Sequence, residues 1–308
     1  MLANAPLLAI FAPHCLRPSI TSFPFSMKHL RSSSASRQLR LCWLLLLLVT
    51  SSATHAQELS FQQLTTGETV RGFAAQAVYL DDLDRPMGGR FLHQRTGFTL
   101  DLLSIQSAPQ AFIWVNSAPT SDMGEPHTQE HLLLGKGNNG RRHANLEGVS
   151  AVSSSAFTEQ LRTCYHFHTA AGIGVFHQLF ESQMDALLHP DYSDEEIRRE
   201  VRNFGVAVNP ADGKLRLEEK GTVYNEMVSS FERGWSRMAR AVDIAMYGPH
   251  HPLAFVSGGL PAAIRQMKPE DIRRFHAANY QLWNMGMIAS LPAPFELEAT
   301  LARFDSAL

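Results

Sequence analysis

The alternation of apolar and polar residues predicts strands in the first half of the chain and one near its end. β-Rich runs separated by turns of Asp, Pro, Gly and Ser read as strands, and they cover residues 68–80, 89–104 and 110–116. A further strand is expected around residues 149–168, and a last one at 285–291. Strands that follow one another without regular helical crossovers favour a mainly antiparallel sheet.

Helical spacing of apolar residues, together with start and stop signals, predicts several helices. They are expected at residues 126–135, 173–188, 194–204, 217–246 and 269–280. The longest is interpreted as one continuous helix because its apolar residues mostly follow a single stripe: Val223, Met227, Phe231, Met238, Val242 and Ala245. The combined pattern predicts an α+β fold with helices packed on one face of a mainly antiparallel sheet.

Residues 1–56 have the pattern of a secretory signal peptide. Met27 begins a basic stretch, and the apolar run Leu41–Val49 and small residues up to Ala56 follow it. This order is typical of a segment that is removed on export, and so short an apolar run cannot span a bilayer. We therefore expect a periplasmic or secreted protein without a stable membrane span, with Met27 as an alternative start.

The remaining residues, 57–308, are enough for one large domain or two small ones. A net charge of −2 and a pI near 6.7 provide no basic surface for nucleic acid. Of the three cysteines, only Cys164 lies outside the leader, so no internal disulfide is expected. An exported chain without disulfides fits a bacterial periplasm.

The segment His127-Thr-Gln-Glu130-His131 supplies two imidazoles and a carboxylate at a spacing that a catalytic zinc ion uses. In a helix, His127 and His131 are one turn apart on the same face, so both rings can reach one metal ion. Glu130 lies on the neighbouring flank, which suits a general base that acts on a metal-bound water. The order His-x-x-Glu-His is the inverse of the commoner zinc peptidase motif.

A catalytic zinc ion commonly has three protein ligands and one water. Glu226 is the best downstream candidate for the third ligand. If 217–246 is one helix, Glu219 lies two turns before it on nearly the same face and can accept a hydrogen bond from a ligand histidine. Three alternatives stay open: surface histidines on an ordinary helix, a solvated Glu226, and a Glu219 that pairs with a cation such as Lys220.

These motifs resemble the pitrilysin/insulysin (insulinase) zinc metallopeptidase family, and specifically its presequence-protease branch. Glu226 follows His131 by 95 residues, within the run KGTVYNEM. Other segments resemble that branch in the same order, among them GGRFLHQRTGFTLDLL, PTSDMGEPHTQEHLLLGKG, SSAFTEQLRTCYHF and YGPHHPLAFVSGGLPAAIRQMKPEDIRRFHAANY. The resemblance covers residues 65–291.

The resemblance implies a zinc endopeptidase that hydrolyses unstructured peptides. It makes His127, His131 and Glu226 the ligands of one Zn²⁺ ion and Glu130 the general base. Glu219 occupies the place of an auxiliary acidic residue. An edge strand that holds the substrate backbone is implied at Ser155, Ala156, Phe157 and Thr158, although this run departs from the family's Asn-Ala-x-Thr.

The family members are built from four homologous domains in two halves, whereas this chain corresponds to about one domain. Residues 57–308 are therefore expected to be an N-terminal zinc peptidase domain, truncated before the remaining domains. A missing C-terminal half or a partner subunit would then complete the molecule. The alternative function is a non-catalytic or incomplete peptide-binding fragment or subunit that needs a partner half for activity.

Overall fold

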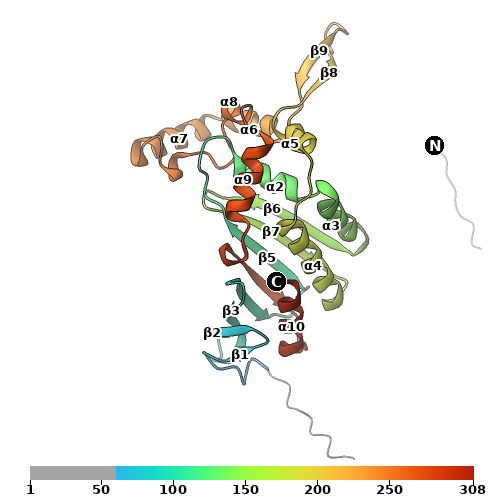
Figure 1. The fold of residues 1–308 in the computed structure, drawn as a ribbon, viewed down its shortest axis with the longest axis vertical. Helices are drawn as coiled ribbons and strands as arrows, with labels where there is room; N and C mark the ends of the chain where they lie inside the picture. Colours follow the sequence, from blue (N-terminus) through green and yellow to red (C-terminus); the bar gives the residue numbers. More distant parts are fainter. Residues whose placement is uncertain (1–59) are drawn as a thin grey trace, which may run out of the picture. The chain divides into compact units, whose positions relative to one another are not determined.

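An eight-stranded sheet forms the centre of the fold (Figure 1). The computed structural model describes residues 60–308, so the predicted signal peptide and the alternative start at Met27 lie outside the described residues. The strands run in the order β1-β2-β3-β4-β10-β5-β7-β6. Neighbouring strands are antiparallel except for the parallel pair β4 and β10. The prediction of a mainly antiparallel sheet is confirmed.

The strands of the large sheet are β1 (Thr69–Val70), β2 (Phe73–Leu80), β3 (Pro86–His93), β4 (Thr99–Ser104), β5 (Gln110–Asn116), β6 (Val152–Thr158), β7 (Arg162–Thr169) and β10 (Met285–Leu291). A separate two-stranded sheet consists of β8 (Phe204–Val208) and β9 (Leu215–Glu219). The strand expected around 149–168 is thus a hairpin, because the chain reverses between β6 and β7, where the amide of Glu159 donates to the carbonyl of Arg162.

The described helices are α2 (Glu125–Leu133), α3 (Gly137–Val149), α4 (Ile173–Leu188), α5 (Asp194–Val201), α6 (Thr222–Glu232), α7 (Gly234–Tyr247), α8 (Pro261–Ile264), α9 (Pro269–Asn279) and α10 (Leu297–Ala307). Short 3₁₀ turns lie at Pro252–Ala254 and Leu282–Asn284. Between residues 60 and 308, each helix is too short or too polar to cross a membrane.

Alternation along β5 shows how the sheet buries one face. Ala111, Ile113 and Val115 are fully buried, whereas Phe112 between them is 38% exposed. Successive side chains of a strand point to opposite faces, so the helices cover the face that holds Ala111, Ile113 and Val115. This arrangement agrees with the predicted α+β fold with helices on one face of the sheet.

The prediction of a single helix over residues 217–246 is wrong. Residues 215–219 form strand β9, and the remainder forms two helices, α6 and α7, separated at Arg233. Arg233 has extended backbone angles, φ −75° and ψ 128°, which end one helix before the next begins at Gly234. Because Glu219 lies on a strand, it does not share a helix face with Glu226.

Candidate metal centre

Helix α2 is fixed at its start by a close backbone contact. Gly124, the residue before the helix, has φ 77°, a left-handed conformation that glycine adopts without strain. A Cβ at this position would lie 2.5 Å from the carbonyl oxygen of Gly258. Pro126 occupies the first turn, where its missing N–H costs nothing. The start of α2 is therefore held against the loop at Gly258.

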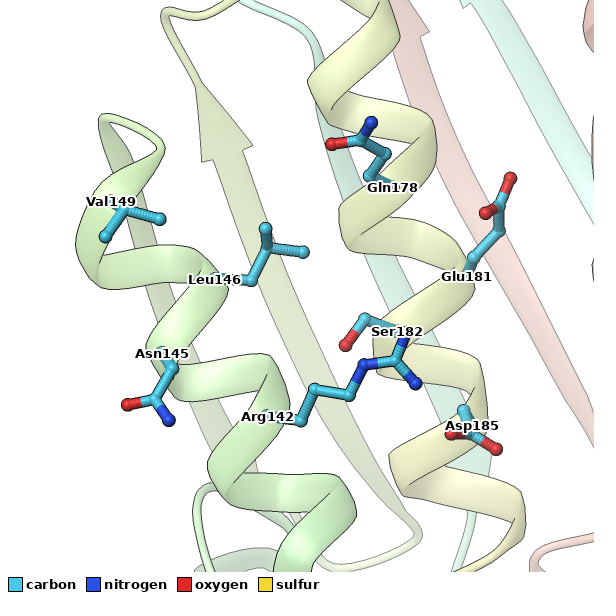
Figure 2. A pocket seen from close by; sticks show the side chains of 8 residues that line it. All are labelled: Arg142, Asn145, Leu146, Val149, Gln178, Glu181, Ser182 and Asp185. Carbon is cyan, nitrogen blue, oxygen red and sulfur yellow. The ribbon is translucent and has the colours of Figure 1, made fainter.

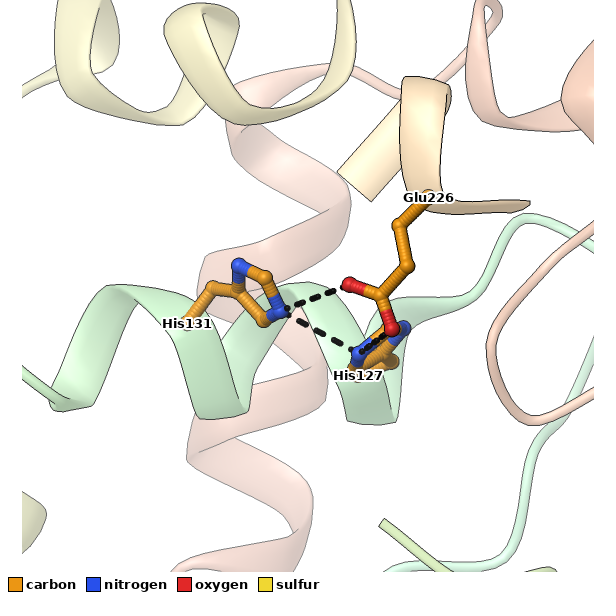
Figure 3. Close-up of side chains that lie close together, drawn as sticks. All are labelled: His127, His131 and Glu226. Carbon is orange, nitrogen blue, oxygen red and sulfur yellow. Dashed lines mark hydrogen bonds and ion pairs between the residues drawn. The ribbon is translucent and has the colours of Figure 1, made fainter. Parts of the chain in front are cut away.

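His127 and His131 lie on successive turns of α2, and Glu226 reaches them from α6 (Figure 3). The two Nε2 atoms are 3.2 Å apart. The Glu226 carboxylate oxygens lie 3.6 Å from His127 Nε2 and 3.4 Å from His131 Nε2. One ligand atom from each residue lies within 4.8 Å of the other two. The structure thus brings together the three residues that the sequence suggested as a metal set.

These separations fit a single small metal ion. Two nitrogen ligands of a tetrahedral zinc ion, each at its usual bond length, are about 3.3 Å apart, close to the distances between these donors. Burial lowers the pKa of His127, and the neighbouring His131 lowers it further. A neutral imidazole keeps the lone pair that a metal needs. Two imidazoles and one carboxylate are also a donor set typical of catalytic zinc.

Glu130 lies beside the three donors in the same cleft, with its carboxylate buried. Its Oε2 accepts a hydrogen bond of 2.5 Å from the hydroxyl of Thr158. Burial raises the pKa of Glu130, while the Thr158 hydrogen bond and His131 act in the opposite direction. The result is a fixed carboxyl group with an increased affinity for a proton, which is what a general base requires.

The predicted substrate strand is β6, at the edge of the large sheet. Ala156, Phe157 and Thr158 line the cleft together with His127, Glu130, His131 and Glu226, and the cavity has a volume of about 450 Å³. Ser155 lies on the same strand and is exposed, but it is not part of this lining. β6 pairs with β7 along one edge, and no described strand pairs with its other edge. The main-chain groups of that open edge can form hydrogen bonds with an extended peptide.

The structure does not bring Glu219 to the histidines. Its carboxylate lies on β9 and pairs with the guanidinium of Arg265, with an Nε–Oε1 distance of 3.2 Å. Arg265 also stacks over the Tyr224 ring at 4.5 Å. This placement agrees with the alternative in which Glu219 pairs with a cation, although the partner is Arg265 instead of Lys220.

Glu200, which the sequence interpretation missed, takes the place beside His131. It is buried on α5, and its Oε2 lies 3.4 Å from His131 Nδ1, at the limit of hydrogen bonding. Its other oxygen is 3.0 Å from Lys136 Nζ. Burial opposes ionisation, but His131 and Lys136 outweigh it and lower the pKa of Glu200. Burial likewise opposes protonation of His131, but Glu200, with smaller contributions from Glu130 and Glu226, outweighs it and raises the pKa of His131.

A signal for Glu200 was present in the sequence. Ile197 and Val201 are buried on the same short helix, so Glu200 interrupts an apolar stripe. A carboxylate in such a position requires a partner. That partner comes from a distant helix, which the pattern of α5 alone does not reveal.

A larger cavity lies elsewhere, in the groove between α3 and α4 (Figure 2). Its volume is about 790 Å³, and its lining consists of side chains such as Arg142, Leu146, Ser182 and Asp185. It includes neither the two histidines nor Glu226. The volume of this groove is larger than that of the cleft beside α2, but only the cleft contains the metal-donor residues His127, His131 and Glu226.

No protein-family model matches the chain. The mitochondrial presequence protease of Danio rerio is 28% identical over 218 residues, which are 68% of this chain and 20% of that protein. The crystal structure of pitrilysin matches with a TM-score of 0.57 and 18% identity, over 76% of this chain and 24% of that one. A putative M16-like peptidase from Alicyclobacillus acidocaldarius matches with a TM-score of 0.53 and 14% identity, over 79% and 51% of the two chains.

The chain thus spans about a fifth of the length of the curated relatives that it matches. The structural matches share its fold, and the sequence matches support a peptidase-like domain. The family resemblance that the motifs carried is confirmed. Sequence and fold together support a relationship of this chain to the insulinase family of peptidases, of the presequence-protease-like kind.

Proposed function

We propose that this chain is a zinc-dependent endopeptidase domain that hydrolyses peptide bonds of unstructured peptides. The observation that carries the proposal is the convergence of two imidazole Nε2 atoms and the Glu226 carboxylate at distances of 3.2 to 3.6 Å. His127, His131 and Glu226 would hold the ion. When bound there, Zn²⁺ polarises a peptide carbonyl and lowers the pKa of a water molecule.

Glu130 is proposed to move the proton. Its buried carboxylate takes a proton from the attacking water and delivers it to the leaving amine. The Thr158 hydroxyl restricts the rotation of this carboxylate through the hydrogen bond to Oε2. Glu200 contacts the Nδ1 side of His131 and so orients the ring, with its Nε2 directed toward the other donors.

Substrate binding is proposed on the edge of β6. An extended peptide that pairs with the main chain of Ala156, Phe157 and Thr158 would lie beside Glu130 and the metal ligands. Main-chain pairing requires an unfolded segment, since the backbone groups of a folded protein are already paired. This is why unstructured peptides are the proposed substrates. Export to a periplasm or out of the cell belongs to the same proposal, on the pattern of residues 1–56.

The second candidate is a peptide-binding fragment or subunit that gains activity only with a partner half. The observation that favours it is the extent of the match, because the chain covers only about a fifth of the length of its relatives. In this case the cleft would bind zinc and peptide, and cleavage would appear only after the missing polypeptide is added.

The test compares Glu130→Gln with His131→Ala. Glu130→Gln should retain zinc and lose hydrolysis of a quenched peptide by about 10²-fold or more, because only the proton transfer is removed. His131→Ala should lose both zinc and activity, because it removes a ligand. Zinc content is measured in both variants by elemental analysis. Equal zinc loss in both would contradict the division of roles, and zinc-loaded wild type that binds peptide without cutting it would favour the second candidate.

A further inference from the structure

Three hydroxyl groups form a chain that leads from the buried sheet to Glu130. Thr158 Oγ1 donates to Glu130 Oε2 at 2.5 Å, and it lies 3.4 Å from Thr163 Oγ1. Thr163 Oγ1 lies 2.8 Å from Ser117 Oγ. Ser117 and Thr163 are fully buried, whereas Thr158 is half-buried at the cleft. The chain of hydroxyls thus begins in the core and ends at the carboxylate of the proposed general base.

The order of the strands places these hydroxyls in a row. Strands β5, β7 and β6 are neighbours in the sheet, and β6 is at its edge. Thr158 ends β6 and pairs with Thr163 on β7, so the two side chains share one face of the sheet. Ser117 directly follows β5, and its amide donates to the carbonyl of Leu161 in the turn between β6 and β7. The row therefore runs across the sheet from its interior to its open edge.

Each hydroxyl carries a single proton, which fixes the direction of the hydrogen bonds. An ionised carboxylate accepts and cannot donate, so the proton of Thr158 points to Glu130. Thr158 must then accept from Thr163, and Thr163 must accept from Ser117. All three O–H groups are therefore directed toward the Glu130 carboxylate. Hydrogen bonds aligned in this way polarise and strengthen one another.

Thr169, also on β7, shows how a buried threonine serves the fold alone. It is fully buried, and its hydroxyl donates to the carbonyl of Ser150 at 2.9 Å and accepts from the amide of Ala171. Thr163 instead bonds to the hydroxyls of other side chains. A buried hydroxyl costs free energy unless it is hydrogen-bonded, and the partners of Thr163 lead to Glu130 instead of to the backbone.

We infer that Thr163 and Ser117 are positioning residues for Glu130. Through Thr158 they hold Oε2 of the carboxylate in place, so that Oε1 is the oxygen that takes the proton from the attacking water. Within residues 60–308, Oε1 receives no hydrogen bond. A general base is efficient only when its accepting atom is held within hydrogen-bonding reach of the proton. This inference rests on the proposed role of Glu130 and adds the residues that hold it.

The first experiment measures cleavage of a quenched peptide by zinc-loaded variants. Thr163→Val removes the hydroxyl at nearly constant volume and should lower kcat about fivefold, the effect of one lost hydrogen bond, with KM and zinc content unchanged. Thr163→Ser keeps the hydroxyl and should recover most of kcat. Thr169→Val is the matched control and should retain the wild-type kcat. An equal loss in Thr169→Val, or no recovery in Thr163→Ser, would overturn the inference.

A second measurement needs neither metal nor activity. Chemical denaturation of the metal-free chain compares the effect of Thr163→Val in the wild type and in Glu130→Gln. Hydrogen bonds to a charged acceptor are the stronger ones, so Thr163→Val should lower the denaturation midpoint more in the wild type. Equal shifts in both backgrounds would mean that Thr163 does not act on Glu130, and the inference would be wrong.

The two measurements separate the inference from the proposed function. A wild type that binds zinc but cuts no peptide would contradict the proposed function, and the denaturation comparison would still decide whether Thr163 acts on Glu130. If Thr163→Val does not fold, as judged by circular dichroism, Ser117→Ala replaces it in both measurements. This variant removes the first donor of the chain, and the same results are expected.

Discussion

At the scale of single residues, the candidate site depends on carboxylates with different environments. Glu226 is exposed and faces both imidazoles, Glu130 is buried with one hydrogen bond from Thr158, and Glu200 is buried between His131 and Lys136. Burial raises the pKa of Glu130, whereas neighbouring cations lower that of Glu200. Three chemically identical groups therefore suit three tasks: metal binding, proton transfer and orientation of a ligand.

Replacement of Glu200 tests the orienting contact. Glu200→Gln should weaken Zn²⁺ affinity by about 10–100-fold, the usual effect of removing a partner of a metal-binding histidine. The affinity is measured by competition with a chelator of known strength. Glu219→Gln is the matched control, because Glu219 pairs with Arg265 and lies away from the histidines. A larger loss in Glu219→Gln than in Glu200→Gln would contradict the assignment.

The sequence predicted the residues of the cluster that carry a local signature. His127, Glu130 and His131 lie within five residues of one helix, so their spacing alone places them together. Glu226 was selected as a downstream carboxylate on a predicted helix, and the family resemblance supported that choice, because no local pattern connects it to α2. Glu200 was missed since its partner, His131, lies on another helix, and Glu219 was misplaced because its position was derived from a helix that does not exist there.

At the scale of elements, bounds were predicted well where the pattern matched the buried face. Helix α4 and strand β10 begin and end where the sequence placed them, at 173–188 and 285–291. The prediction of one helix over 217–246 failed because residues up to Glu219 form β9 and the extended backbone of Arg233 separates α6 from α7. The later apolar residues, which were interpreted as part of one stripe, lie on the exposed face of α7. Periodicity identifies a face, but it does not reveal whether that face packs inward.

Strand β10 depends on a glycine near its start. Gly286 lies between β4 and β5, and a Cβ there would enter the ring of Trp114 and approach the carbonyl oxygen of Thr99 to 2.7 Å. Gly286→Ala should lower the free energy of unfolding by about 1–3 kcal/mol, since the rigid ring and strand must shift. Chemical denaturation measures the change.

The matched control is Gly148→Ala on α3, where a Cβ meets no atom within 4 Å. Alanine is the better helix former, so this variant should gain up to about 1 kcal/mol or remain neutral. Destabilisation of both variants to the same extent would show that crowding at Trp114 is not the cause.

At the scale of the whole molecule, a buried histidine links stability to pH. His177 on α4 is 2% exposed, and burial, with a smaller contribution from Arg303, lowers its pKa to about 4. In the unfolded chain its pKa is about 6.5. The unfolded state therefore binds the extra proton first. The stability contribution of neutral His177 is fully present above about pH 6.5 and is lost as the pH falls toward 4.

We expect the free energy of unfolding to decrease by up to about 3 kcal/mol from this group between those pH values. His177→Phe should flatten this part of the profile, because the ring keeps its apolar neighbours and no longer titrates. His250→Gln, at an exposed position, serves as the control and should follow the wild type. An unchanged slope in His177→Phe would assign the acid sensitivity to other groups.

The edge position of β6 has a consequence for solubility. Main-chain groups left open for a guest peptide could also pair with the same edge of another molecule and seed aggregates. Three successive serines, Ser153 to Ser155, occupy the middle of this strand, where valine or isoleucine would favour such pairing. Weak intrinsic strand propensity at this edge would let β6 pair transiently with a guest peptide, as proposed, and would disfavour stable pairing with the same edge of another molecule.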